Sequence, residues 1–161
     1  MKSRFILLTL ILSLALTITA CDQTPSRGCS DLIVSDAWIR SMPPGPTMTA
    51  GYLQIENHGE ARVTLKGFSS PVFKRIELHE TRQVDGQMQM RAIPSVQIPS
   101  GDIVAMRPGG KHLMLFEPKQ TLQPGEQHKL KLHCAKGTLD VEAEVRTIQP
   151  GKAQDAHHGH H

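Results

Sequence analysis

Short runs in which apolar and polar residues alternate recur along most of this chain, and they are typical of β-strands. In residues 129–134, Leu130, Leu132 and Cys134 alternate with lysine and histidine side chains. A period of two places every second side chain on the same face of a strand. Residues 138–146 repeat this alternation after a short turn, so the two runs predict a hairpin with one buried face.

Seven further runs of β-type residues lie between Gly, Pro, Asn and Asp, and we expect strands at residues 33–40, 51–56, 62–68, 73–79, 87–92, 103–107 and 111–116. No window has a convincing helical period, and the eleven prolines oppose long helices. A length of 161 residues suits one domain of ordinary size. The expected fold class is therefore all-β, a single antiparallel β-sandwich or barrel.

An Asp-Gly dipeptide at residues 85–86 is a strong signal for a two-residue hairpin turn. Such a loop predicts three cross-strand pairs, namely Val84 with Gln87, Thr81 with Met90, and His79 with Ala92. His79, Met88 and Met90 then share one face, with the backbones of His79 and Met90 about 7 to 8 Å apart. A long thioether side chain can close that gap.

His112 and Met114 lie two residues apart on a later predicted strand, so they also share a face. Taken singly, a histidine is more often a surface residue and a methionine a core residue. Taken together, two imidazoles and two thioethers are neutral ligands that suit Cu(I) better than Zn(II), Ca(II) or Mg(II), which rely on thiolate, carboxylate or water oxygen. Local patterning does not show that the two pairs meet.

The charge of the chain is nearly balanced, at +3 overall. Of the 18 basic residues, Lys2 and Arg4 stand at the N-terminus, which leaves 16 against 15 acidic residues. With six aromatic residues and no basic block, the sequence does not indicate a nucleic-acid surface. It also has no paired carboxylates in a catalytic arrangement, no nucleophile-base motif and no phosphate loop, so we do not expect an enzyme.

Residues 1–20 are typical of a secretory signal peptide, with a basic start, an apolar run and small residues before Cys21. The ending resembles a bacterial lipobox, which implies that Cys21 is lipidated and that residues 21–29 tether the protein to a membrane. A retained membrane-spanning helix is the alternative, but the apolar run is shorter than the roughly 20 residues that span a bilayer. Asp22 is similar to an inner-membrane retention signal, so we expect the periplasmic face of a bacterial inner membrane.

Two cysteines, Cys29 and Cys134, remain once Cys21 is assigned to lipid. An even remainder in an exported protein favours one disulfide. Closing a loop of about 100 residues stabilises the fold by up to ~4.7 kcal/mol in the chain-entropy model. The alternative is two free thiols, with Cys134 packed as a small hydrophobic residue.

Residues 150–161 form a tail that we expect to be disordered, because after the proline it contains no apolar residue larger than alanine. Its four imidazoles belong to His157, His158, His160 and His161. Clustered imidazoles favour Cu(II), Ni(II) or Zn(II) over Cu(I), so we expect the tail to capture Cu(II) or to raise the local copper concentration. An inert solvated tail or a purification remnant is the alternative.

The spacing of the four candidate ligands, with ten residues from His79 to Met90 and twenty-one from Met90 to His112, resembles the signature of the periplasmic PCu(A)C copper chaperones. The similarity covers about residues 34–145 and includes five flanking segments, Asp36-Ala-Trp-Ile-Arg40, Pro43-Pro44-Gly45, Gly51-Tyr-Leu-Gln-Ile-Glu-Asn57, Glu77-Leu-His-Glu-Thr81 and Pro108-Gly-Gly-Lys-His-Leu-Met114. The resemblance implies a cupredoxin-like Greek-key β-sandwich at residues 30–149 and a Cu(I) site of His79, Met90, His112 and Met114. Met88 shares the face of Met90 and is the alternative ligand there.

The same resemblance implies a function and a partner. The protein would deliver Cu(I), without redox chemistry, to the cytochrome c oxidase subunit that carries the CuA centre or to a Sco-type assembly protein, and we expect it to be a monomer. Two alternatives stay open. One is an envelope lipoprotein that buffers copper and delivers none, and the other is a metal-free β-sandwich that binds protein or carbohydrate.

Overall fold

The computed structural model describes residues 28–43 and 45–147 of the chain. The predicted signal peptide, the lipidation site at Cys21 and the histidine tail at residues 150–161 lie outside the described residues. The predictions made for these segments therefore stay predictions.

The described chain forms ten β-strands and one short 3-10 helix. The helix is η1 (Cys29–Asp31), and the strands are β1 (Leu32–Arg40), β2 (Met48–Asn57), β3 (Val63–Ser69), β4 (Phe73–Val84), β5 (Gln87–Ala92), β6 (Val96–Ile98), β7 (Ile103–Met106), β8 (Lys111–Pro118), β9 (Gln127–Cys134) and β10 (Thr138–Arg146). Every predicted strand is present, and the all-β prediction is confirmed. The strand that was missed is β6, whose three residues are too few to carry a recognisable period. Within the described segments, no helix is long and apolar enough to cross a membrane.

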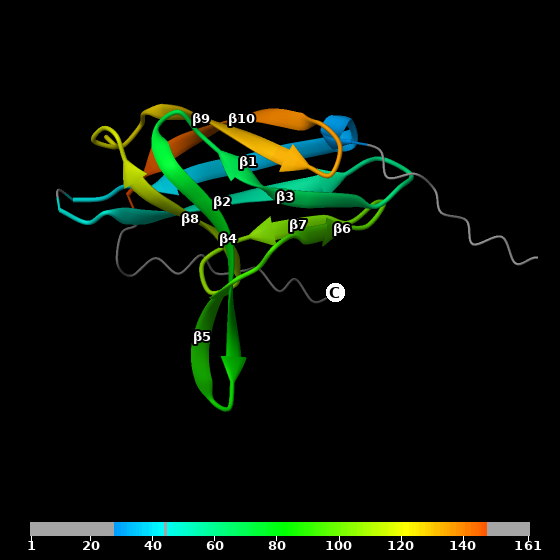
Figure 1. Cartoon of the computed structure of the whole chain (residues 1–161), viewed down its shortest axis with the longest axis horizontal. Helices are drawn as coiled ribbons and strands as arrows, with labels where there is room; N and C mark the ends of the chain where they lie inside the picture. Colours follow the sequence, from blue (N-terminus) through cyan, green and yellow to red (C-terminus); the bar gives the residue numbers. More distant parts are fainter. Residues whose placement is uncertain (1–27, 44, 148–161) are drawn as a thin grey trace, which may run out of the picture.

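The strands form one curled sheet in the order β5-β4-β8-β2-β1-β10-β9-β3-β6, and β7 pairs with β2 beside this path. Figure 1 shows β9, β10 and β1 lying over β2 and β8, so that the curled sheet makes two layers. Among the described strands, all neighbouring pairs are antiparallel except β1 with β10, which are parallel. The predicted antiparallel β-sandwich is thus confirmed, with one parallel pair where β10 returns beside the first strand.

The β9–β10 hairpin supplies one side of the core. Leu130 lies opposite Val141, and Leu132 lies opposite Leu139. Leu130, Leu132 and Val141 are buried, as their alternation predicts. Full burial of such a side chain contributes about 1.5 to 3 kcal/mol relative to exposure, which explains why the pattern fixes which face turns inward.

Strand β8 supplies the other side of the core and, at the same time, orients two candidate ligands. Leu113 and Leu115 have no exposed surface and point into the core. Because successive side chains point to opposite faces of a strand, His112 and Met114 must lie on the outer face of the sheet. The burial of two leucines therefore decides where the imidazole and the thioether point.

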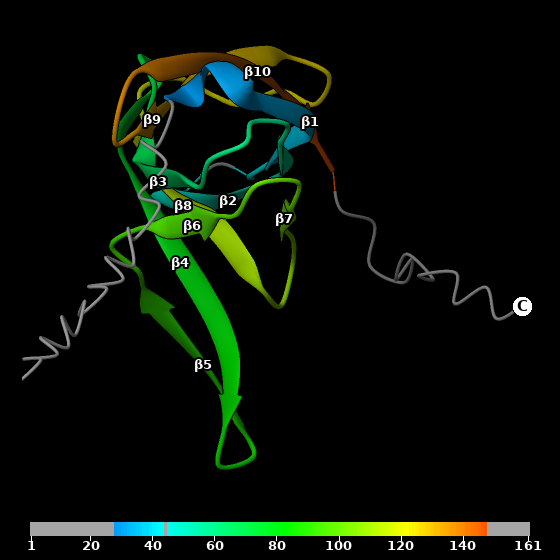
Figure 2. The same ribbon diagram turned by 90° about the vertical axis from the view of Figure 1, so that its right-hand side faces the viewer.

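The β4–β5 hairpin projects from the body of the molecule, as Figures 1 and 2 show. Its turn has positive φ at both central residues, 50° at Asp85 and 80° at Gly86, which is the combination that a type I′ turn requires. The three predicted pairs are all observed, Val84 with Gln87, Thr81 with Met90, and His79 with Ala92. All six residues of β5 are exposed, so this strand adds nothing to the core.

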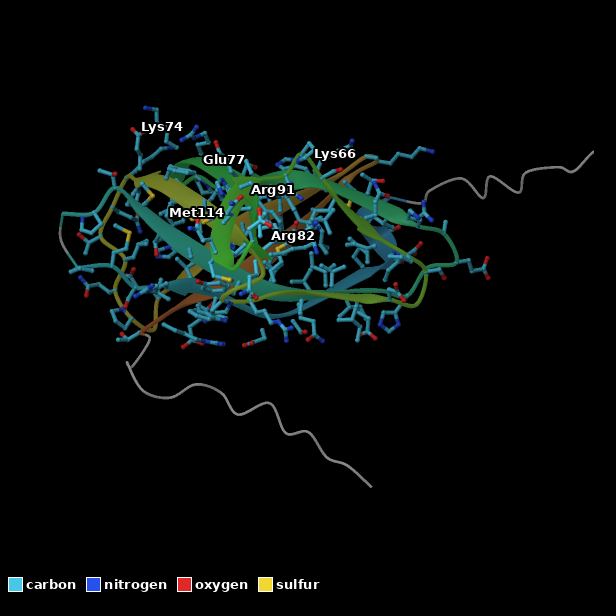
Figure 3. The ribbon with its side chains drawn as sticks, turned by 90° about the horizontal axis from the view of Figure 1, so that it is seen from below. Lys66, Lys74, Glu77, Arg82, Arg91 and Met114 are labelled. Carbon is cyan, nitrogen blue, oxygen red and sulfur yellow. A yellow bond between two sulfur atoms is a disulfide. The ribbon has the colours of Figure 1, made fainter. Side chains whose placement is uncertain are left out.

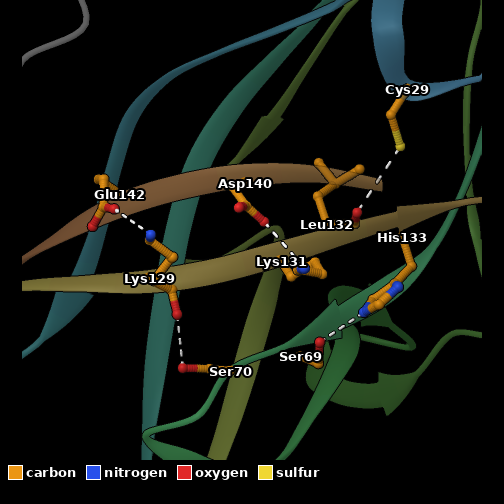
Figure 4. Close-up of polar contacts among 9 residues, drawn as sticks. All are labelled: Cys29, Ser69, Ser70, Lys129, Lys131, Leu132, His133, Asp140 and Glu142. Atoms are coloured by element: carbon orange, nitrogen blue, oxygen red, sulfur yellow. Dashed lines mark hydrogen bonds and ion pairs between the residues drawn. The ribbon is translucent and has the colours of Figure 1, made fainter. Parts of the chain in front are cut away.

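Cys29 and Cys134 form a disulfide in the structure, with their Cα atoms 5.7 Å apart. The bridge ties η1 to the end of β9. Figure 4 shows the polar contacts around this side of the sheet, including Ser69 Oγ with His133 Nε2 at 2.7 Å. The Lys131–Asp140 pair is exposed, with 3.6 Å between Nζ and Oδ1, and exposed ion pairs contribute little to stability.

Candidate metal centre

Three adjacent strands, β5, β4 and β8, bring the four predicted ligands onto one face of the sheet. His79 on β4 lies opposite His112 on β8 in the register of the sheet. Two pairs further along, and therefore on the same face, Glu77 lies opposite Met114. On the other side of β4, Met90 lies opposite Thr81, two residues from His79. The tertiary structure thus places the two sequence pairs side by side, which local patterning did not establish.

The ring of His112 is held so that one nitrogen remains free. Its Nδ1–H donates to the carbonyl oxygen of Gly110 at 2.9 Å. That hydrogen bond leaves the lone pair on Nε2, which lies 3.2 Å from the sulfur of Met90. Two atoms that each offer a lone pair do not attract one another at this distance, but both can bind a cation. His112 is 6% exposed, so the imidazole side of this pair is shielded from water.

The ring of His79 is held in the same manner by a different group. Its Nε2–H donates to the carboxylate of Glu77 at 2.9 Å. The other nitrogen, Nδ1, is buried and has no hydrogen-bond partner in the structure. An unpartnered buried nitrogen is costly unless a ligand occupies it. The centroids of the His79 and His112 rings are 6.0 Å apart, so the two imidazoles lie close together.

The two thioethers differ in exposure. Met114 is half-buried between β4 and β2, opposite Glu77 and Ala50. Met90 is 54% exposed, although its sulfur touches His112. One sulfur thus lies within the sheet surface and the other on a projecting edge strand, from which it can move without disturbing the core.

Two aromatic side chains pack beside the candidate site, on the side next to β2. The rings of Trp38 and Tyr52 are 4.4 Å apart, and the ring of Tyr52 is 6.5 Å from that of His112. A register shift between Ser35 and Trp38 in β1 brings Trp38 opposite Tyr52. Burial raises the pKa of the Tyr52 phenol above its ordinary value of 10.0, although Arg40 lowers it. The phenol is therefore neutral at physiological pH and adds no charge to the site.

Glu80, on the opposite face of β4, links the three strands that carry the ligands. It lies opposite Arg91 on β5 and Lys111 on β8. Its carboxylate contacts three cations, Arg82 at 2.6 Å, Lys111 at 3.1 Å and Arg91 at 3.8 Å. Burial by itself raises the pKa of the Glu80 carboxyl, but the hydrogen bonds and charges of Arg82 and Lys111 outweigh it and hold the pKa below 4.5. Figure 3 shows Arg82, Arg91, Glu77 and Met114 around the ribbon of β4.

The sequence predicted four candidate ligands but assigned no role to the groups that orient them. Glu77 had a detectable signal, because a carboxylate two residues before a histidine on a strand shares its face. The Gly110 carbonyl had none, because it reaches His112 through the shape of the loop after Gly109, whose φ is 78°. Within residues 28–43 and 45–147, no group of three or more His, Cys, Asp or Glu side chains is arranged to hold a metal ion.

Known proteins resemble this chain in sequence. A family model described as "Putative lipoprotein LpqE-like" matches residues 32–145. The "Putative lipoprotein Lxx21020" of Leifsonia xyli subsp. xyli is 28% identical over 144 residues, which cover 84% of this chain and 86% of that protein. The "Uncharacterized protein RP573" of Rickettsia prowazekii is 28% identical over 116 residues, covering 65% and 64% of the two chains.

Solved structures resemble it in fold. The solution structure of CuI-DR1885 from Deinococcus radiodurans superposes with a TM-score of 0.61 at 26% identity, covering 79% of this chain and 85% of that one. The copper-bound PCuAC domain from PmoF2 superposes with a TM-score of 0.62 at 20% identity, covering 73% and 94%. The fold is that of a PCuAC-type β-sandwich. The chain belongs to the LpqE-like family, whose model covers most of the described domain.

Proposed function

We propose that this protein is a copper chaperone that binds Cu(I) through His79, Met90, His112 and Met114 and passes the ion to an acceptor. The single observation that supports the proposal best is the free Nε2 of His112 facing the sulfur of Met90 at 3.2 Å, beside His79 with its unpartnered Nδ1. The similarity to the copper-bound PCuAC domain and to CuI-DR1885 points in the same direction.

The chemistry of the donor set favours Cu(I) as the cargo. Thioether sulfur is soft and polarisable, and imidazole nitrogen is borderline, so the set suits a soft monovalent ion. Because it has no anionic thiolate, the set should hold the ion less firmly than a thiolate cage. Ligands can then be exchanged one at a time with an acceptor, and the ion keeps its oxidation state.

The proposed place of action is the outer side of a bacterial inner membrane. The family and its relative in Leifsonia are described as lipoproteins, which agrees with lipidation of Cys21. Fully extended, the eight residues from Cys21 to Cys29 span at most about 28 Å, so a lipid at Cys21 keeps the domain near the bilayer. The proposed acceptor is the oxidase subunit that carries CuA, or a Sco-type assembly protein.

The ligand assignment is tested by removing one donor at a time. In competition with a chromophoric Cu(I) chelator, His112→Ala and Met114→Leu should each weaken Cu(I) binding by more than about 10-fold, since losing even a ligand's supporting hydrogen bond has that effect. X-ray absorption of the loaded protein should give mixed nitrogen and sulfur coordination. His58→Ala and Met42→Leu are matched controls away from the site and should bind normally. Unchanged affinity in both site variants would overturn the assignment.

Delivery and buffering differ in their effect on the cell. If the protein delivers copper, a deletion strain should lose oxidase activity, and added copper should restore it. Normal activity without the protein would favour buffering.

The histidine tail is proposed as a separate Cu(II) site, and removal of residues 156–161 should abolish Cu(II) binding while leaving Cu(I) binding intact.

A further inference from the structure

Met88 is an exposed methionine that packing does not explain. It is 61% exposed, more than Met90 at 54% or Met48 at 48%. A methionine on a soluble protein usually fills gaps in a core. Strand β5 lies outside the core along its whole length, so no gap exists there for Met88 to fill.

The register of the hairpin places Met88 on the metal-binding face, one step outward from the proposed site. Met88 lies opposite Gln83, and Met90 lies opposite Thr81. Residues two apart on a strand point to the same face and are separated by about 6.4 to 6.8 Å. Met88 is therefore the next sulfur beyond Met90 toward the tip of the hairpin, which Figure 2 shows projecting away from the body.

The surroundings of Met88 on this face are neutral. Its cross-strand partner Gln83 carries an amide, and the next pair inward is Thr81 with Met90. Beyond His79, the charged residues of the two hairpin strands are Glu80, Arg82 and Arg91, which belong to the opposite face and contact one another. Glu77 is a carboxylate of β4 on this face, but it lies six positions along the strand from Gln83 and is bonded to His79. The thioether of Met88 can therefore act as a soft neutral donor.

We propose that Met88 is a transfer ligand, through which Cu(I) moves between the four-residue site and an acceptor with soft donors. The proposal rests on the Cu(I) binding proposed above. A bond from the sulfur of Met88 to the ion forms while a bond from the ion to one inner ligand breaks. Copper remains Cu(I), and because a thioether carries no proton, neither an electron nor a proton moves.

Two variants test whether the sulfur atom of residue 88 is needed, as distinct from the size of the side chain and from the face of β5 on which a sulfur lies. Met88→Leu keeps the size of the side chain and removes the sulfur. The double variant Met88→Gln with Gln89→Met keeps the composition of β5 but moves the sulfur to the opposite face. Since every residue of β5 is exposed, neither variant should unfold the domain, and a proton-nitrogen correlation spectrum checks this.

The test measures transfer rate and equilibrium affinity separately. Stopped-flow transfer of Cu(I) from the loaded chain to bathocuproine disulfonate should be slower by about 10-fold in Met88→Leu, equivalent to about 1.4 kcal/mol in the barrier. The double variant should be equally slow. Equilibrium affinity for Cu(I) should stay within a few-fold of the wild type, and the ε-methyl resonance of Met88 should shift or broaden when Cu(I) is added.

The outcomes distinguish this inference from the proposed function. If the wild-type chain binds no Cu(I), the proposed function fails and the transfer role fails with it. If the wild type binds Cu(I) but Met88→Leu transfers it at the normal rate, only the transfer role is overturned. Full rescue by the double variant, or a loss of affinity in Met88→Leu as large as in Met114→Leu, would also overturn it, the latter by making Met88 a resident ligand.

Discussion

At the scale of single residues, hydrogen bonds decide which nitrogen atoms of the site are free. Glu77 accepts from Nε2 of His79, and the Gly110 carbonyl accepts from Nδ1 of His112. Each bond fixes a ring orientation and, in the neutral imidazole, leaves the lone pair on the other nitrogen. The two histidines therefore differ in which nitrogen they offer, although both stand on neighbouring strands at the same register position.

Glu77→Gln should weaken Cu(I) binding by about 10- to 100-fold, because the carboxylate both orients the His79 ring and increases its basicity. Competition with a Cu(I) chelator measures the change. Glu56→Gln is a matched control, since Glu56 also contacts a histidine two residues further on, His58 at 3.3 Å. Equal affinities in the two variants would contradict a role for Glu77 in the site.

At the scale of elements, β5, β4 and β8 act as one unit that carries all four proposed ligands. Two of these strands, β4 and β8, have core residues, but β5 has none and is held by its turn and its ladder to β4. The carboxylate of Glu80 bonds to side chains from all three strands on the face opposite the site. The position of Met90 therefore depends on polar contacts more than on packing.

The stabilisation by Glu80 should depend on pH with a definite sign. Because its folded-state pKa lies below 4.5, its contribution is present above that value and is lost as pH falls through the folded-state pKa. Glu80→Gln should lower the free energy of unfolding at pH 7 by about 1 to 2 kcal/mol, a value reduced by the exposure of its cationic partners.

Urea denaturation at pH 7 and at pH 3 measures this effect, and the difference between wild type and Glu80→Gln should shrink at the lower pH. Glu142→Gln is the control, because Glu142 forms an exposed pair with Lys129 at 3.9 Å and should have little effect at either pH. A constant difference across the pH range would contradict the assignment.

At the scale of the whole molecule, the chain is stabilised by a disulfide on elements other than those that carry the proposed metal site. The disulfide of Cys29 and Cys134 closes a loop with a sequence separation of 105 and lies at η1 and the end of β9. The proposed two-His, two-Met site lies on other elements, strands β4, β5 and β8. Substitutions at the disulfide should therefore change stability without changing metal binding.

Replacing both Cys29 and Cys134 by alanine should lower the free energy of unfolding by up to about 4.7 kcal/mol, because the unfolded chain regains the entropy that the loop removed. Urea denaturation with and without reductant measures this, and Cu(I) affinity should be unchanged. Alkylation of two thiols in the unreduced wild-type protein, detected by mass, would contradict the bridge.

The sequence by itself determined the strands and the faces on which their side chains lie. The alternation in residues 129–134 and 138–146 predicted the β9–β10 hairpin, and the dipeptide Asp85-Gly86 predicted the β4–β5 register pair by pair. These features follow from the period of two in a strand and from the φ values that a tight turn needs, both of which are local.

The tertiary structure alone decided that the two pairs of candidate ligands lie side by side. His79 and His112 are 33 positions apart, and only the pairing of β4 with β8 sets them opposite each other. The same pairing brings His112 within reach of Met90 and Lys111 to the carboxylate of Glu80. No local pattern encodes these contacts, because which strands become neighbours depends on how the whole sheet buries its core.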